Sequence, residues 1–206
     1  MDLKDEFTDQ NIDITLPVII GYPVLDKYLI QKLVGEIISK GEGSNSNYAQ
    51  VLDVSMEKSE MEEYDLRINF TLQTLTSLFK NWQIKMAFHA ALELDRELQH
   101  ISLKKFEVDG ETNNWFANQI LETVINRWMY EKLKKKLNFN FMPVIEEKVG
   151  AINEKLESKL EAKEGVHLIG ALNKLEVSNL KAGKNELWIS VTITGTGIVE
   201  LEKLEL

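Results

Sequence analysis

The strongest constraint on the fold is a long run of near-strict alternation between apolar and polar side chains, from Trp82 to Asp95. Every even-numbered position in this run is apolar, and the odd-numbered positions are mostly polar. Successive side chains of a β-strand point to opposite faces, so the pattern predicts a strand with one continuous apolar face. At ~3.3 Å per residue this strand would measure roughly 43 Å, about twice the usual length. It indicates a tall, curved sheet whose apolar face needs an apolar cover.

The same alternation recurs elsewhere, interrupted by segments of helical period. Apolar side chains at every second position predict strands over 12–20, 48–56, 64–72, 101–108, 166–177 and 187–199. Apolar side chains three or four residues apart predict helices over 24–40, from Thr112, Asn113 or Asn114 to Leu137, and from Pro143 to about 164. We therefore expect an α+β fold of order β-α-β-β-β-β-α-α-β-β. It would form a single domain over residues 1–206, with a flexible N-terminus at 1–11.

Single residues add detail to this scheme. Pro17 has no backbone N–H, which predicts that its strand lies at a sheet edge. The alternation changes phase at Lys104 and Lys105, which predicts a β-bulge. Gly195 and Gly197 predict a bend or bulge in the last strand. We expect the four central strands to pair in sequence order as an antiparallel meander.

The composition excludes several classes of function. The formal net charge is −9, so the chain lacks the clustered cations that wrap a phosphate backbone, and we expect no nucleic-acid partner. There is no cysteine, which excludes disulfides, thiol catalysis and a lipidated cysteine. The sequence shows no signal peptide and no apolar run of transmembrane length. The expected location is the cytoplasm, or the cell envelope if a signal has been removed, and the oligomeric state is left open.

The histidines give no sign of a metal site. His89, His100 and His167 lie far apart in the sequence, whereas metal ligands usually cluster. We interpret them as solvent-facing or strand-end side chains, and His89 lies in the polar phase of its strand. We therefore expect neither a metal nor another cofactor.

Catalytic motifs are also absent. The sequence contains no phosphate-binding loop, no nucleophile turn and no His-Glu-x-x-His motif. Asp95 with Glu97, and Asp9 with Asp13, are candidate carboxylate pairs, but their positions are more typical of acidic turn residues. We expect a protein that is not an enzyme, and a hydrolase is the least favoured alternative.

A short basic cluster has two interpretations. Lys132, Lys134, Lys135 and Lys136 follow Arg127 near the end of a predicted helix. Cations at a helix C-terminus complement the helix dipole on a solvated face, which is the interpretation we favour. The second interpretation is a weak contact with a membrane surface.

The apolar stripes of the strands and helices are the main functional candidates. They are either ordinary core or the lining of a groove for an apolar ligand, and the pattern allows both. The candidate lining residues are Leu29, Leu33, Leu66, Ile68, Phe70, Trp82, Ile84, Met86, Phe88, Leu92, Ile120, Val124, Trp128, Ile189 and Val191. Met86 would adapt to irregular contents because its thioether chain is flexible.

Most of the chain resembles a bacterial family of domains of unknown function. The resemblance rests on the order of LELDRELQHISLKKFEVDG, NRWMYEKLKKKLNF, MPVIEEKVGAINEKLESKL and GVHLIGALNKLEVSNLKAGKNELWISVTITGTG, and on the opening ITLPVIIGYPVLDKYLIQKLVGEI. That family is thought to be related to tubular lipid-binding (TULIP) proteins, such as bactericidal/permeability-increasing protein and synaptotagmin-like mitochondrial lipid-binding domains. The resemblance implies a highly curved antiparallel sheet wrapped around a long helix, with a lipid-accommodating groove between them. It implies no catalytic residues.

Three function classes follow, and the third, an enzyme, is disfavoured because no catalytic motif supports it. The first is a non-catalytic module that binds a lipid or another apolar ligand between the curved sheet and a helix. The second is a structural or interaction domain with a fully packed core and no ligand. A helix-grip ligand-binding fold is disfavoured, because that fold normally ends on its long helix, whereas two strands are predicted after the helices here.

Overall fold

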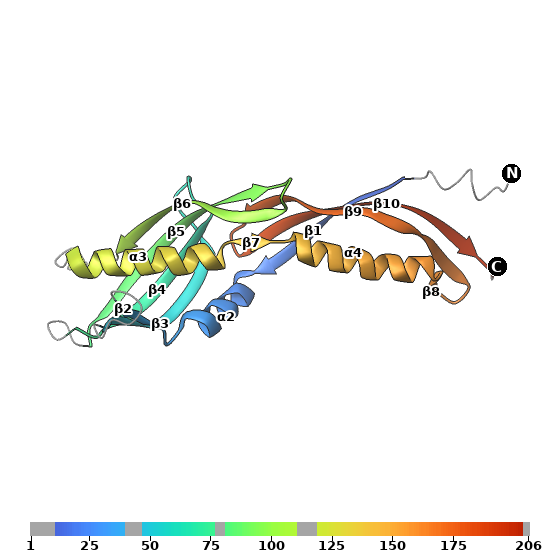
Figure 1. Ribbon diagram of the computed structural model, residues 1–206. Helices are drawn as coiled ribbons and strands as arrows, with labels where there is room; N and C mark the ends of the chain where they lie inside the picture. The colour runs from blue at the N-terminus through green and yellow to red at the C-terminus, as the bar shows by residue number, and fades with distance from the viewer. Residues whose placement is uncertain (1–10, 40–46, 77–80, 111–118, 204–206) are drawn as a thin grey trace.

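The alternating segments form two antiparallel sheets in the computed structural model, which describes residues 11–39, 47–76, 81–110 and 119–203 (Figure 1). The elements are β1 (Asn11–Gly21), α2 (Tyr22–Leu33), β2 (Ile37–Ser39), β3 (Asn47–Lys58), β4 (Leu66–Thr74), β5 (Gln83–Asp95), β6 (His100–Gly110), α3 (Gln119–Lys136), β7 (Phe139–Asn140), α4 (Met142–Glu157), β8 (Leu160–Lys163), β9 (Val166–Ala182) and β10 (Glu186–Leu201). The wide sheet has the strand order β2-β3-β4-β5-β6-β7, and the narrow sheet has the order β1-β10-β9-β8. The described part of the chain is therefore α+β, as predicted, but its strands divide between two sheets.

The two sheets follow one another along the long axis of the molecule (Figure 1). The wide sheet curls around α3 like half a barrel, and α4 lies beneath the narrow sheet. The chain starts in the narrow sheet with β1, builds the wide sheet, and returns to the narrow sheet with β8, β9 and β10. The narrow sheet is thus assembled from the two ends of the described chain.

The main core lies between the wide sheet and the helices α2 and α3. Ile125, Met129 and Leu133 recur every four residues on α3 and are completely buried. They pack in one cluster with alternate side chains of β4 and β5 and with Leu29 and Leu33 of α2. The period of 3.6 in the helices and the period of 2 in the strands produce these matching apolar faces.

Several local predictions are confirmed. The strand that contains Pro17 is an edge strand of the narrow sheet. The β5–β6 register skips Lys104, which is the bulge that the phase change predicts. The β9–β10 register shifts between Thr194 and Gly195, as the glycines of the last strand predict. Strands β3 to β6 pair in sequence order, as expected for a meander.

The predicted boundaries of two helices are wrong. The helix expected over 24–40 ends at Leu33, because Gly35 adopts a φ of 87° and the chain then enters β2. The helix expected from Pro143 to about 164 ends at Glu157, and its last apolar residue, Leu160, begins β8. The strands β2, β7 and β8 are too short to show a clear period.

Two further expectations concern chain ends and caps. Residues 1–10 of the expected flexible N-terminus lie outside the described residues, whereas Asn11 begins β1. The proposed caps Thr112, Asn113 and Asn114 also lie outside the described residues. Among the described helices, none is long and apolar enough to span a membrane.

Candidate apolar ligand site

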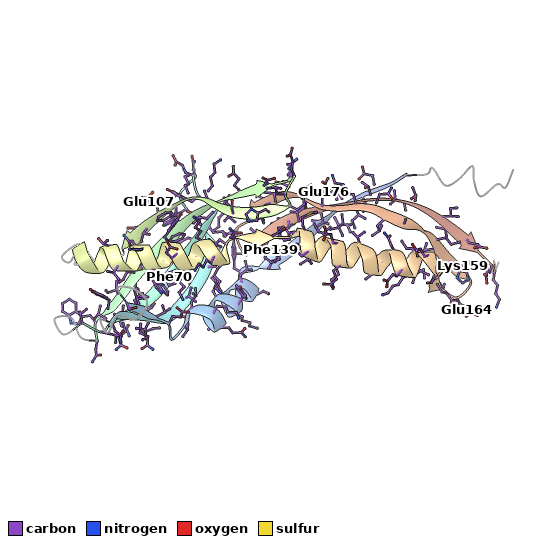
Figure 2. All side chains as sticks on the ribbon, viewed as in Figure 1. Phe70, Glu107, Phe139, Lys159, Glu164 and Glu176 are labelled. Atoms are coloured by element: carbon purple, nitrogen blue, oxygen red, sulfur yellow. The ribbon has the colours of Figure 1, made fainter. Side chains whose placement is uncertain are left out.

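Most of the predicted lining residues belong to the main core. The buried ones are Leu29, Leu33, Leu66, Ile68, Phe70, Ile84, Met86 and Phe88. Leu92, Val124 and Trp128 are half-buried and pack against the same cluster. The ring of Phe70 meets that of Trp128 edge-on at 6.4 Å, between the wide sheet and α3 (Figure 2). These side chains therefore contact one another across the interior of the wide sheet.

Three predicted lining residues lie elsewhere, and a fourth has a side chain that the structure does not describe. Trp82 precedes β5 and is 54% exposed, so it is not part of this core. The side chain of Ile120 lies outside the described residues. Ile189 and Val191 belong to β10 and therefore to the narrow sheet, away from the core around α3. The sequence thus grouped residues that the structure distributes between two sheets.

The narrow sheet has one apolar face, which we call the apolar trough. Directly paired residues of antiparallel strands point to the same face. Across β1, β10 and β9 the rows of this face are Ile14–Ile193–Leu175, Leu16–Val191–Val177 and Val18–Ile189–Leu180. The alternation of all three strands therefore places their aliphatic side chains on one continuous surface.

Only one side of the apolar trough is covered. The helix α4 packs against β9, and Asn153 fixes it there through two hydrogen bonds with the backbone of Leu172. The Leu172 N–H donates to Oδ1 over 2.6 Å, and Nδ2 donates to the Leu172 carbonyl over 3.1 Å. On β1, Ile14, Leu16 and Val18 remain 43–48% exposed. The helix thus forms one wall of the trough and leaves the β1 side open.

The opposite face of the narrow sheet is mainly polar. Thr15 and Thr192 face one another with their hydroxyl oxygens 3.2 Å apart. The hydroxyl of Thr192 donates to that of Ser178, which donates to the backbone carbonyl of Ser190. This hydroxyl ladder is typical of a solvated sheet face, so the exposed aliphatic side chains of the trough stand in contrast to it.

The trough ends in a pocket of ≈ 690 Å³ where the two sheets meet. We call this the junction pocket. It is lined by Arg96, Glu97 and Gln99 of the β5–β6 turn, by Met142, Ile145, Glu146, Val149 and Gly150 of α4, and by Asn173, Lys174, Leu175 and Glu176 of β9. Its lining includes the aliphatic residues Ile145, Val149 and Leu175 together with charged residues of both signs. Leu175 belongs to both the pocket and the trough, so the two surfaces are continuous.

Gln99 closes the pocket by joining the two sheets. Its Oε1 accepts the N–H of Val177 over 2.6 Å, and its Nε2 donates to the carbonyls of Val177 and Arg96 over 3.2 and 2.7 Å. Its own carbonyl accepts the N–H of Phe141, immediately before α4, over 2.8 Å. Gln99 is 4% exposed and has a positive φ of 49°. It thus connects the β5–β6 turn, β9 and the start of α4.

The interpretation of His89 as a solvent-facing side chain is wrong. His89 is completely buried, on the face of the wide sheet opposite to α3. The connection between β3 and β4 covers it: the Ser59 hydroxyl lies 2.9 Å from Nδ1, and the Tyr64 ring lies against the imidazole with centroids 6.0 Å apart. The hydroxyl of Tyr64 donates a hydrogen bond over 3.1 Å to the carboxylate of Glu107, a residue that Figure 2 labels. This covering loop keeps a polar-phase side chain away from solvent.

The other two histidines lie elsewhere. His100 Nε2 is 2.5 Å from Asn138 Oδ1, and His167 Nε2 is 3.3 Å from the carboxylate of Glu202. Nowhere in the described ranges do three histidine or acidic side chains gather in a way that could hold a metal ion.

The candidate carboxylates and lysines have local contacts. Asp95 Oδ1 accepts the N–H groups of Glu97 and Leu98, so this pair forms a turn, whereas Asp9 lies outside the described residues. In the basic cluster, Lys132 pairs with Glu36 over 2.5 Å, and Lys134 lies 5.2 Å from the centre of the Tyr130 ring.

No direct signal in the sequence indicates the junction pocket. Its aliphatic members belong to stripes that also predict ordinary core. Its five charged members come from a turn, from α4 and from a strand more than 70 residues after that turn. Only the pairing of β9 with β10 and the docking of Gln99 bring them together. A chain this rich in acidic residues offers no charge pattern that marks these five among the others.

Comparison with known proteins identifies a family. The family described as "Domain of unknown function (DUF4403)" matches residues 2–201. No curated protein and no solved structure matches the chain.

Proposed function

The chain belongs to the DUF4403 family, and we propose that it is a non-catalytic module that binds a lipid or another apolar ligand in the trough of the narrow sheet. One observation supports this proposal above all: a row of aliphatic side chains on β1 is 43–48% exposed beside a helix that packs mainly against β9. Large exposed apolar surfaces on a folded chain are typical of binding sites. The opposite face also exposes Ile19 and Trp188, but its other rows are polar, whereas each of the three trough rows is aliphatic throughout.

The site differs from the one expected around α3. The apolar faces of the wide sheet, α2 and α3 pack against each other, and that packing accounts for their burial without a ligand. The trough has aliphatic side chains that are already ordered by sheet pairing yet only partly covered. We therefore place the ligand beside α4 instead of beside α3.

The expected affinity follows from burial of an acyl chain. Sixteen methylene groups at about 0.8 kcal/mol each contribute roughly 13 kcal/mol. Association costs at least about 4 kcal/mol, which leaves up to about 9 kcal/mol and a dissociation constant near the micromolar range. A half-open trough buries the chain only in part, so we expect micromolar rather than nanomolar binding.

The first test is recovery of the ligand. The protein is purified without detergent, and native mass spectrometry and solvent extraction are used to detect bound lipid. We expect added mass in the native spectrum and a matching lipid in the extract. If neither appears, and fluorescent fatty acids and phospholipids also fail to bind at micromolar concentration, the proposal is wrong.

A matched pair of variants locates the site. Leu16 and Ile19 lie on β1, are 48% and 55% exposed, and point to opposite faces of the sheet. Leu16→Gln places an amide in the trough, so we expect at least a fivefold weaker binding of a fluorescent fatty acid. Ile19→Gln makes a similar change on the opposite face and should leave binding within twofold. Equal effects of the two variants would argue against the trough.

A second candidate function is a protein interaction domain that uses the same apolar face. The packed core around α3 supports it, because the wide half needs no ligand to be complete. Absence of lipid together with a concentration-dependent increase in the mass of the particle in solution would favour it.

We also propose that the wider relationship of the chain is with tubular lipid-binding proteins, which the curled sheet around α3 supports (Figure 1).

A weak membrane contact through Lys132, Lys134, Lys135 and Lys136 stays a prediction. The ion pair of Lys132 with Glu36 reduces the charge available there. Sedimentation with vesicles of increasing anionic lipid content measures this contact independently of ligand binding.

A further inference from the structure

We propose that two copies of this chain pair through the free edge of β1 and join their narrow sheets into one continuous antiparallel sheet. β1 is the outer strand of the narrow sheet, and in the described part of the chain it pairs on one side only, with β10. Every residue from Asp13 to Ile19 is exposed. The pairing does not depend on a ligand in the trough.

The backbone groups of β1 alternate between its two edges. The Tyr22 N–H donates to the Asn185 carbonyl over 3.2 Å, immediately before β10 begins. Successive amides of a strand point to opposite sides, so the N–H and C=O groups of the odd-numbered residues of β1 point away from β10. Pro17 is one of these residues, and its missing N–H therefore falls at the free edge. The odd-numbered residues on either side of it still offer donors and acceptors there.

β1 has few of the features that prevent edge strands from pairing. Protected edge strands are usually short, bulged or charged. β1 has 11 residues and pairs with β10 in an unbroken register, and its one charged side chain is that of Asp13. Pro17 removes one donor per copy but leaves its carbonyl available. The edge therefore permits pairing with another strand and limits its strength.

The sequence of β1 makes a second copy a suitable partner. The exposed run from Asp13 to Ile19 is centred on Leu16. An antiparallel copy in this register places Leu16 opposite its own counterpart and Ile14 opposite Val18, so these pairs on the trough face are aliphatic. The two Asp13 side chains then lie about 20 Å apart along the strands, and like charges do not meet. A two-fold axis perpendicular to the sheet relates the copies, and their troughs lie on the same side.

The size of the contact predicts a weak, reversible dimer. A standard interface buries about 800 Å² per partner over about 20–30 residues, so 11 residues of each copy bury roughly 800 Å² in total. This area is typical of transient complexes. The register gives about six backbone hydrogen bonds between Asp13 and Ile19, after the loss of the Pro17 donors. We expect a dissociation constant of about 100 μM.

Two single-cysteine variants test the contact and its register. The chain has no cysteine, so an introduced thiol can form a disulfide only with another copy. Leu16→Cys places the thiol opposite its counterpart in a non-hydrogen-bonded pair, where Cα atoms are about 4.5 Å apart and a disulfide can form. Val18→Cys is the matched control, with an exposure of 43% against 48% for Leu16. It lies opposite Ile14, so its two thiols are about 14 Å apart and cannot bridge.

The rates of cross-linking decide the outcome. Both variants are oxidised with copper phenanthroline at about 100 μM protein and followed on non-reducing gels. We expect Leu16→Cys to form the covalent dimer at least about tenfold faster than Val18→Cys. Equal rates would indicate random collision and overturn the proposal.

Sedimentation velocity of the unmodified chain measures the dimer without a cross-link. We expect comparable amounts of monomer and dimer at about 100 μM and monomer at about 1 μM. Ile19→Pro removes a donor from the free edge, whereas Ile19→Ala shortens the same side chain and keeps the N–H. We expect the proline to weaken self-association about tenfold and the alanine less than about threefold, with circular dichroism showing that both variants are folded.

The remaining outcomes overturn the pairing of copies. A chain that stays monomeric up to about 500 μM overturns it, and so does an effect of Ile19→Pro no larger than that of Ile19→Ala. An edge that accepts a strand of a different protein would give the first of these results. Fatty-acid binding at about 1 μM protein tests the trough on the monomer, so failure of the dimer leaves the proposed ligand site standing.

Discussion

Replacement of Gln99 is the sharpest test of how the two sheets are joined. Gln99→Ala removes three hydrogen bonds made by one buried amide, two of them to the backbone of Val177. The Val177 N–H would lose its partner in a buried position, which costs about 1–3 kcal/mol, and the two bonds from Nε2 add about 0.5–1 kcal/mol each. We expect a loss of about 3 kcal/mol in the free energy of unfolding. For a chain of this size that corresponds to a fall of about 6–12 °C in Tm.

Two measurements check this prediction. Urea unfolding followed by circular dichroism gives the change in free energy, and hydrogen exchange followed by mass spectrometry gives the protection of the segment around Val177. We expect exchange in that segment to accelerate about a hundredfold, since 1.4 kcal/mol corresponds to a factor of ten.

A matched control uses another glutamine that donates to a backbone carbonyl. Gln50 Nε2 donates to the Gly35 carbonyl over 3.4 Å in an exposed position, so Gln50→Ala should cost less than about 0.5 kcal/mol. If Gln99→Ala is as mild as this control, or leaves exchange at Val177 unchanged, the Gln99 amide does not join the sheets.

Three further predictions test packing and ionisation. An added Cβ at Gly170 would lie 2.1 Å from the Thr196 carbonyl oxygen, so Gly170→Ala should lower the free energy of unfolding by more than about 3 kcal/mol. Gly150 lies inside α4, where an added Cβ meets no atom within 4 Å, so Gly150→Ala should raise the free energy of unfolding by about 0.5–1 kcal/mol. Chemical unfolding measures both. Burial, and then Glu186, raise the pKa of Tyr22 above its usual 10.0. Its hydroxyl donates to the Gly183 carbonyl, so Tyr22→Phe should lower the free energy of unfolding by about 1 kcal/mol at pH 8. This difference between variant and wild type should shrink as the pH rises above 10. A group with a raised pKa in the folded state loses its stabilising effect as it ionises, and only the wild type has that group. Burial raises the pKa of Asp26 above its usual 3.8, although its Oδ1 accepts the Met56 N–H. Asp26→Asn should therefore match or exceed the wild type in unfolding free energy at pH 7, and this advantage should disappear below pH 4. If the variant instead loses stability relative to the wild type when the pH is raised from 4 to 7, the pKa of Asp26 is not raised.

The local structure could be predicted because its signals are local. The alternation before Asp95 predicts β5 almost to the residue, and the phase change predicts the bulge at Lys104. The first helix was predicted too long because Ile37 continues its apolar spacing, while the positive φ of Gly35 ends it. A period describes which face a residue occupies, but a single glycine decides where the element stops.

Long-range pairing could not be predicted in the same way. β1 pairs with β10 from opposite ends of the described chain, and this pairing creates a second sheet where the pattern indicated one. His89 shows the related difficulty for burial. Its phase in β5 was identified correctly as opposite to the apolar face, but the loop that carries Ser59 and Tyr64 folds over it. Alternation assigns a side chain to a face and does not reveal what covers that face.

The difference between the two sheets follows from where each helix is held. Apolar side chains hold α3 over the middle of the wide sheet, where Ile125, Met129 and Leu133 are completely buried. The helix α4 is held by hydrogen bonds between the side chain of Asn153 and the backbone of Leu172 in β9. Leu172 lies beyond the part of β9 that pairs with β8. The strand β10 lies between β9 and β1, and the β1 side chains of the trough stay partly exposed. The same alternating pattern therefore forms a filled core in one half of the molecule and a partly open apolar surface in the other, where Asn153 holds α4 beside β9.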